Sequence, residues 1–95
     1  MTKEIKSISK KVISVLKNHR AVRAGFFGSA ATGRFTSKSD VDILVELPKN
    51  ISLLGYAAIK NELEDKLGRK VDLVEYDAIK PQIRESIMKE QVRIL

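Results

Sequence analysis

The fold and the chemistry of this chain are encoded most densely in residues 28–45, which read GSAATGRFTSKSDVDILV. A turn of small residues, Gly28-Ser29, opens this stretch, and two carboxylates, Asp40 and Asp42, stand at the head of an apolar run. Glycine lets a backbone approach a phosphate closely, and carboxylate oxygens are good ligands for hard cations. The stretch therefore contains the groups needed to hold a metal ion and a nucleoside triphosphate.

Hydrophobic periodicity predicts helices that alternate with strands along the chain. The expected helices span residues 2–19, 29–32 and 52–67, and the expected strands span residues 21–27, 41–47 and 70–76. Asp77 is expected to cap a final helix that carries Pro81 in its opening turns, where proline is tolerated. The apolar tail at residues 92–95 could add a strand, pack on the core or bind a partner, and the sequence leaves these options open.

The order α-β-α-β-α-β-α predicts an α/β (α+β) fold, in which helices flank a small mixed sheet of three or four strands. At 95 residues the chain is expected to form one domain, residues 1–95. There is no cysteine, which excludes disulfides and thiolate metal sites. No apolar run is long enough for a membrane span, and no signal-like segment opens the sequence, so we expect a cytoplasmic protein.

The net charge of +6 has two interpretations. It can keep the protein soluble, or it can attract an anion such as a nucleotide or an acidic partner. Because the lysines are scattered along the predicted helices rather than grouped in a block, we favour solubility for most of them. No interleaved aromatic pattern of the kind that stacks on bases is present, so nucleic acid is an unlikely partner.

Strand geometry gives the acidic pair a chemical meaning. Residues two apart in a strand point to the same face, so Asp40 and Asp42 can converge on one cation. Asp72 stands at the start of the third strand and would join them if that strand neighbours the second. Three such carboxylates repel one another unless a cation lies among them, and ligation by oxygen alone suits Mg²⁺. Each piece is weak by itself, but the turn, the pair and the later acidic strand in this order are specific.

The spacing of Gly-Ser, ten residues, Asp-x-Asp and a later acidic strand resembles the DNA polymerase β-like nucleotidyltransferase superfamily. Residues 63–74 (LEDKLGRKVDLV) and the Ile83–Ile87 segment resemble its minimal nucleotidyltransferase (MNT) branch. The resemblance covers the chain from about residue 21 onward. It implies a nucleotidyltransferase core that binds ATP and Mg²⁺ and transfers a nucleoside monophosphate to a hydroxyl. It also implies pairing with a HEPN-type toxin, for which the MNT protein is the antitoxin.

The resemblance assigns roles to individual residues. Asp40 and Asp42 would be metal ligands, and Asp72 would complete the site and could take the acceptor proton. Gly28 and Ser29 would hold the phosphates. Many family members carry arginines just after the Gly-Ser turn, whereas this chain has Ala-Ala-Thr at residues 30–32, so Arg34 is a candidate substitute.

Three functions remain open at this point. The leading one is an Mg-dependent transferase that moves AMP from ATP to a hydroxyl of a partner protein, as the antitoxin of a HEPN/MNT pair. The second is an antitoxin that neutralises its toxin by contact alone, and the third is a transferase of the antibiotic-modifying type that acts on a small molecule. A small domain with an open site is expected to work in a homo-oligomer or a hetero-complex.

Overall fold

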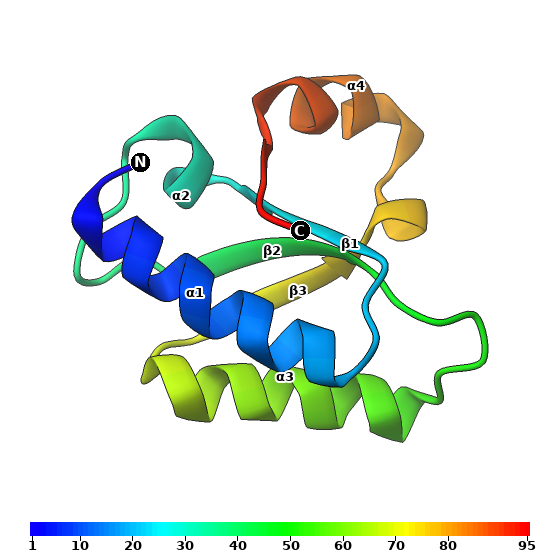
Figure 1. Ribbon diagram of the computed structural model, residues 1–95. Coiled ribbons are helices and arrows are strands. Elements are labelled where there is room, and N and C mark those ends of the chain that lie inside the picture. Colours follow the sequence, from blue (N-terminus) through cyan, green and yellow to red (C-terminus); the bar gives the residue numbers. More distant parts are fainter.

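The computed structural model describes residues 1–95, and its elements follow the expected order (Figure 1). The helices are α1 (Lys3–Asn18), α2 (Ser29–Thr32), α3 (Leu53–Leu67) and α4 (Pro81–Glu90). The strands are β1 (Arg23–Phe27), β2 (Val41–Glu46), β3 (Val71–Glu75) and β4 (Val92–Arg93), and a 3-10 helix, η1 (Tyr76–Ala78), follows β3. The predicted α/β class is confirmed. No helix combines the length and the hydrophobicity that a membrane span requires.

The four strands form one mixed sheet in the order β3-β2-β1-β4. β2 and β3 run parallel, and α3 connects them, as a parallel pair requires a crossover. β1 is antiparallel to both of its neighbours, β2 and β4. The third strand therefore does neighbour the second, which was the condition for bringing Asp72 to the acidic pair.

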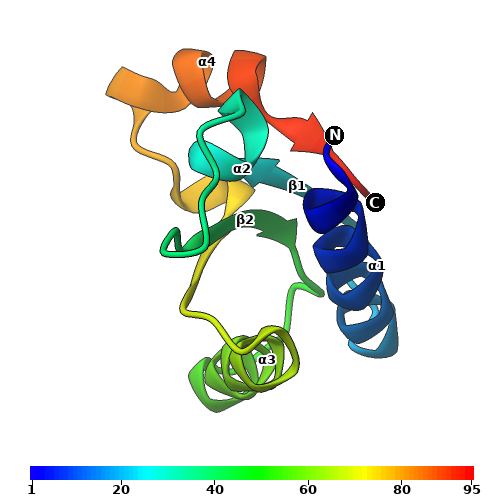
Figure 2. The same ribbon diagram turned by 90° about the vertical axis from the view of Figure 1, so that its left-hand side faces the viewer.

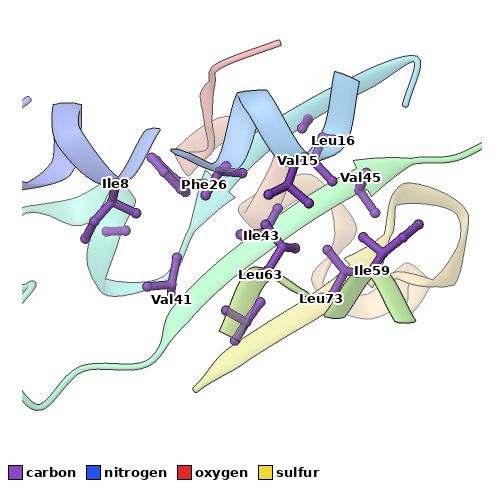
Figure 3. Close-up of a cluster of buried hydrophobic side chains, with 14 of the residues drawn as sticks. Ile8, Val15, Leu16, Phe26, Val41, Ile43, Val45, Ile59, Leu63 and Leu73 are labelled. Carbon is purple, nitrogen blue, oxygen red and sulfur yellow. The ribbon is translucent and has the colours of Figure 1, made fainter. Parts of the chain in front are cut away.

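α1 and α3 lie together on one face of the sheet, and α4 lies on the other (Figures 1 and 2). Alternate residues of β2, Val41, Ile43 and Val45, point toward α1 and α3 and are fully buried. Ile59 and Leu63 of α3 pack in the same core, which is shown in Figure 3. This core fixes the register of β2, because a shift by one residue would turn Asp42 into it.

The opposite face of the sheet is covered only in part. Leu44 forms a smaller buried cluster with Tyr76 and Ile79, and Ile87 of α4 packs against it. Phe27 packs against this cluster and Phe26 lies in the larger core, so consecutive residues of β1 point to opposite faces of the sheet. We call this side the carboxylate face and define it by Gly25, Phe27, Asp42, Leu44, Asp72 and Val74.

The prediction that Asp77 caps the final helix is wrong. Asp77 lies in η1, and α4 begins only at Pro81, with Lys80 as the residue before it. Lys80 has an extended backbone (φ −61°, ψ 136°), because a residue that precedes proline is disfavoured in the helical region. Proline then occupies the first helical position, where its missing N–H costs least.

The tail at residues 92–95 adds a strand and also packs on the core. Val92 pairs with Phe26 in the β1–β4 ladder. The Ala24 N–H donates to the Leu95 carbonyl at 3.0 Å, and the Ile94 N–H donates to the Ala24 carbonyl at 2.9 Å. The side chains of Ile94 and Leu95 pack against the larger core. Two of the three options for the tail are therefore realised together.

Candidate active site

The centre of the candidate site is a pair of carboxylates on adjacent strands. Asp42 of β2 and Asp72 of β3 are register partners in the parallel ladder. Directly paired residues of neighbouring strands point to the same face and are about 4.8 Å apart at the backbone. Both carboxylates therefore stand side by side on the carboxylate face, with Asp72 exposed and Asp42 half-buried. The predicted approach of Asp72 to the acidic pair is confirmed at Asp42.

Negative charge is crowded around Asp42. Burial raises the pKa of its carboxyl to about 6, and repulsion from Asp72 and then from Asp40 adds to the rise. A carboxyl with a raised pKa and two acidic neighbours is stabilised by a proton or by a cation. Oxygen ligands of this kind suit Mg²⁺, which keeps several waters and takes its other ligands from substrate phosphates. The residues present therefore fit the expected metal.

Asp40 does not lie on the strand that carries Asp42. β2 begins at Val41, so Asp40 lies at the end of the preceding loop, exposed, and outside the ladder. It is close enough to raise the pKa of Asp42. No three acidic or histidine side chains in the chain lie close enough together to enclose an ion by themselves. The structure thus brings Asp42 and Asp72 together and leaves Asp40 beside them at the end of the loop.

Gly28 lies directly against the carboxylate pair. The preceding residue, Phe27, is the register partner of Asp42 in the antiparallel β1–β2 ladder. Gly28 has a positive φ of 63°, and a Cβ placed on it would lie 2.2 Å from Oδ2 of Asp42. Only glycine fits both the conformation and the space. The turn predicted from the sequence is therefore next to the carboxylates in space.

The turn continues into a single helical turn. The Gly28 carbonyl accepts hydrogen bonds from the N–H groups of Ala31 and Thr32, each at 3.1 Å, and from the Thr32 hydroxyl at 3.1 Å. α2 ends at Gly33, whose φ is 79°. Arg34 follows, exposed and without an ion-pair partner. The structure thus places Gly28 at the carboxylates and leaves Arg34 free on the loop.

An apolar pocket of about 290 Å³ borders Asp72. The sheet contributes Phe27, Leu44 and Val74 to its wall, and the segment around α4 contributes Ile79, Lys80, Ile83 and Ile87. Ile79, Ile83 and Ile87 recur every four residues, a spacing that is typical of an apolar helix face. This spacing does not indicate which face of the sheet the helix covers, so the pocket could not be predicted from the sequence. Three other hollows, of about 330, 640 and 310 Å³, are not lined by any of the three aspartates.

His19, the only histidine, does not belong to the site. Its Nε2 lies 3.2 Å from Oε1 of Glu62, in a contact that joins the end of α1 to α3. Both helices cover the face opposite to the carboxylates. His19 caps the end of α1 and lies away from the carboxylates, so it is neither a ligand nor a base of this site.

Comparison with known proteins gives one consistent result. A sequence model described as "Nucleotidyltransferase domain" matches residues 5–94. A protein of Methanocaldococcus jannaschii, MJ0435, whose name proposes a protein adenylyltransferase, is 41% identical over 91 residues, which is 96% of this chain and 98% of that protein. A solved structure whose description proposes a minimal nucleotidyltransferase is 36% identical, with a TM-score of 0.79, and the match covers 92% of this chain and 89% of that one.

A more distant structure has the same fold. The MNT antitoxin complex with a tri-AMPylated HEPN toxin of Shewanella oneidensis contains a chain that matches with a TM-score of 0.75. The match covers 96% of this chain and 71% of that one, at 17% identity. At this identity the likeness establishes the shared fold.

Proposed function

The chain belongs to the nucleotidyltransferase domain family, and from this membership we propose that it transfers AMP from Mg-ATP to a hydroxyl group of a partner protein. The single observation that supports this most is the arrangement of Asp42, Asp72 and Gly28. Two carboxylates are register partners on adjacent strands, and a glycine whose positive φ and close neighbour disfavour any side chain lies against one of them. The proposed cation site thus lies next to a backbone position that a phosphate can approach closely.

Each residue has a distinct role in this proposal. Gly28 and Ser29 hold the phosphates through the backbone and the serine hydroxyl. Asp40 and Asp42, with Asp72, would hold Mg²⁺, which would neutralise phosphate charge and orient the triphosphate. Because two acidic neighbours already raise the pKa of Asp42, its carboxylate gains strongly from a cation.

Asp72 is proposed to act on the acceptor. The acceptor oxygen forms a bond to the α-phosphorus as the bond from that phosphorus to the pyrophosphate oxygen breaks. The hydroxyl proton passes to the Asp72 carboxylate, which lies on the side of Asp42 away from Gly28. The apolar pocket that borders Asp72 is then the place for the side chain that carries the hydroxyl. Chemistry here consists mainly of positioning and electrostatic stabilisation.

The region after the turn is less cationic than the resemblance predicts. Ala30, Ala31 and Thr32 supply no charge to a triphosphate. Arg34 follows on the loop, is exposed and has no acidic partner, so its guanidinium is available for phosphate. We assign it this role.

The partner we propose is a HEPN-type toxin, with this chain as its antitoxin. The support is the relative whose name proposes a protein adenylyltransferase, together with the complex of an MNT antitoxin with a tri-AMPylated HEPN toxin.

The test uses the purified chain, labelled ATP, Mg²⁺ and the product of the neighbouring gene, which this proposal expects to be a HEPN protein. Label is expected on the HEPN protein, and an Asp42→Asn variant is expected to lower the rate by more than about 100-fold, because it removes a ligand rather than a supporting group. Asp77→Asn is the matched control, since Asp77 is an exposed carboxylate outside the site. Equal labelling by the wild type and Asp42→Asn would contradict the catalytic assignment.

Two additions to this experiment, an assay of toxin neutralisation and a small alcohol as an alternative acceptor, separate the other two functions. If Asp42→Asn still neutralises the toxin without labelling it, the chain acts by contact alone. If label appears on an added small alcohol and never on the protein, the chain is a small-molecule transferase.

A further inference from the structure

The loop that ends at Asp40, residues 33–40, is largely exposed but locally ordered. The Ser39 N–H donates to the Thr36 carbonyl at 3.1 Å, and the Thr36 N–H donates to the Ser39 hydroxyl at 2.9 Å. These bonds close a turn over residues 36–39, but they do not attach that turn to the rest of the molecule. Asp40, which follows the turn directly, needs such an attachment to keep a fixed position.

Arg69 provides this attachment from the connection between α3 and β3. Its Nη1 donates to the carbonyls of Thr36 and Ser39, at 3.0 and 3.2 Å. Its guanidinium carbon lies 4.5 Å from the ring centre of Phe35. Its Nη2 is 3.4 Å from Oε1 of Glu4 on α1. One side chain, only 18% exposed, therefore joins the loop to both the α3–β3 connection and α1.

The contacts of Arg69 lie next to the candidate ligand Asp40. The Ser39 carbonyl belongs to the peptide group that leads into Asp40. On the other side of Asp40, the Val41 N–H donates to the Lys70 carbonyl at 3.0 Å. Consecutive residues, Arg69 and Lys70, thus fix the backbone immediately before and immediately after Asp40.

The contacts require an arginine rather than a positive charge alone. A guanidinium is planar, presents several donors in a fixed fork and stacks on an aromatic ring, whereas an ammonium is a compact point charge. The ion pair to Glu4 does not explain why an arginine stands at this position, because Glu4 is 55% exposed and exposed ion pairs contribute little to stability. The contacts specific to arginine are those to the loop.

We propose that Arg69 is a positioning residue that holds Asp40 in place for the transfer reaction, through the Thr36 and Ser39 carbonyls and the Phe35 ring. The inference rests on the proposed role of Asp40 as a ligand of Mg²⁺. Groups that orient metal ligands typically contribute 10- to 100-fold, roughly, to metal affinity or activity. Arg69 acts through the backbone of the ligand and does not touch the substrate.

The test compares Arg69→Ala and Arg69→Lys with the wild-type chain, using Arg23→Ala as the matched control. Arg23 also pairs with a glutamate, Glu46, at 2.7 Å and lies over an aromatic ring, that of Tyr76, at 4.0 Å, but it does not contact the loop. The first readout is the rate of trypsin cleavage after Arg34 and Lys38, which lie within the loop. We expect cleavage to be about tenfold faster in both Arg69 variants and unchanged in Arg23→Ala.

The second readout is the Mg²⁺ dependence of labelling. In both Arg69 variants the Mg²⁺ concentration for half-maximal transfer is expected to rise about tenfold or more, with thermal midpoints close to that of Arg23→Ala. Cleavage at the wild-type rate in both variants would overturn the proposal, and so would full recovery of both readouts by lysine. The cleavage assay needs no activity, so it decides the role of Arg69 in holding the loop even if the wild type transfers nothing and the proposed function fails.

Discussion

The close approach of Gly28 to Asp42 strongly restricts which residue can occupy position 28. It predicts that Gly28→Ala is damaging for two separate reasons. A Cβ would meet Oδ2 of Asp42 at 2.2 Å, and alanine is strained at a φ of 63°. We expect a loss of about 2–3 kcal/mol in the free energy of unfolding, measured by urea denaturation, together with loss of transfer activity.

Gly33→Ala is the matched control for this prediction. Gly33 also has a positive φ, 79°, but a Cβ there would meet no atom within 4 Å. Only the conformational strain remains, so we expect a cost of about 1 kcal/mol. Equal costs for the two variants would show that the approach to Asp42 does not constrain Gly28.

The raised pKa of Asp42 predicts a stability that depends on pH. The folded-state pKa of about 6 lies above the ordinary value of 3.8 for an aspartate, so the folded protein binds a proton that the unfolded chain releases. The stability linked to this proton is fully present below pH 3.8 and is lost as the pH rises through about 6. Asp42→Asn is therefore expected to be more stable than the wild type at about pH 7.5, and equally stable at about pH 4.

The size of this gain is limited, because Asp42 is half-exposed and solvent screens its neighbours. We expect about 1 kcal/mol by urea denaturation at neutral pH. Mg²⁺ is expected to raise the thermal midpoint of the wild type by binding the folded state, and to have a smaller effect on Asp42→Asn. A variant less stable than the wild type at neutral pH would show that Asp42 is not under electrostatic strain.

Strand alternation was sufficient to predict part of the site. It placed Asp42 opposite to Val41 and Ile43, and it placed Asp72 beside Asp42 once the two strands were neighbours. It could not place Asp40, which lies before the strand and depends on a loop. The partner of that loop, Arg69, is distant in sequence and carries no local pattern, so the sequence did not indicate its contacts.

At the element scale, the helices and strands themselves were predictable but the positions of the last two were not. The isoleucines of α4 indicated an apolar face, and the tail at residues 92–95 was visibly apolar. Neither pattern specifies which sheet face or edge an element will cover, because both faces offer apolar surface. Without the tail the sheet has two open edges, those of β1 and β3, and the tail pairs with β1.

Pairing of the tail with β1 predicts a stabilising role for residues 92–95. Their deletion removes backbone hydrogen bonds to Ala24 and the packing of Ile94 and Leu95 on the core. Each hydrogen bond contributes about 1 kcal/mol net, so we expect a total loss of about 2–4 kcal/mol in urea denaturation. Arg93→Ala changes an exposed side chain of the same strand and is expected to stay within about 0.5 kcal/mol. An unchanged stability after the deletion would mean that the β1 edge does not need its partner.

The whole molecule is divided by its sheet into a face covered by α1 and α3 and a face that carries the candidate site (Figure 2). The alternation of helices and strands predicted a layered α/β fold. It did not predict the strand order, because β1 and β2 are joined by a long connection, residues 28–40, that permits either direction. Because β1 and β2 are antiparallel, Gly28 at the end of β1 lies next to Asp42 near the start of β2.

The same division separates much of the positive charge from the site. α1 carries five lysines and one glutamate, and all five lysines are exposed: Lys3, Lys6, Lys10, Lys11 and Lys17. The sheet and its core lie between most of this helix and the carboxylates of Asp42 and Asp72, and only its first turn, through Glu4 and Arg69, reaches the loop that ends at Asp40. Charges separated by more than the Debye length, about 8 Å at physiological ionic strength, interact weakly through solvent. These lysines are therefore expected to contribute to solubility rather than to nucleotide binding.

A triple variant, Lys6→Gln, Lys10→Gln and Lys17→Gln, tests this separation. The KM for ATP is expected to stay within about twofold of the wild-type value at low and at physiological salt, because the charges are screened from the site. Arg34→Gln changes a single charge on the loop that follows the Gly28 turn and is expected to raise the KM several-fold, about 1 kcal/mol. A rise in KM for the triple variant at low salt that matches or exceeds that of Arg34→Gln would show that the field of α1 reaches the nucleotide. The net charge would then be part of the binding mechanism.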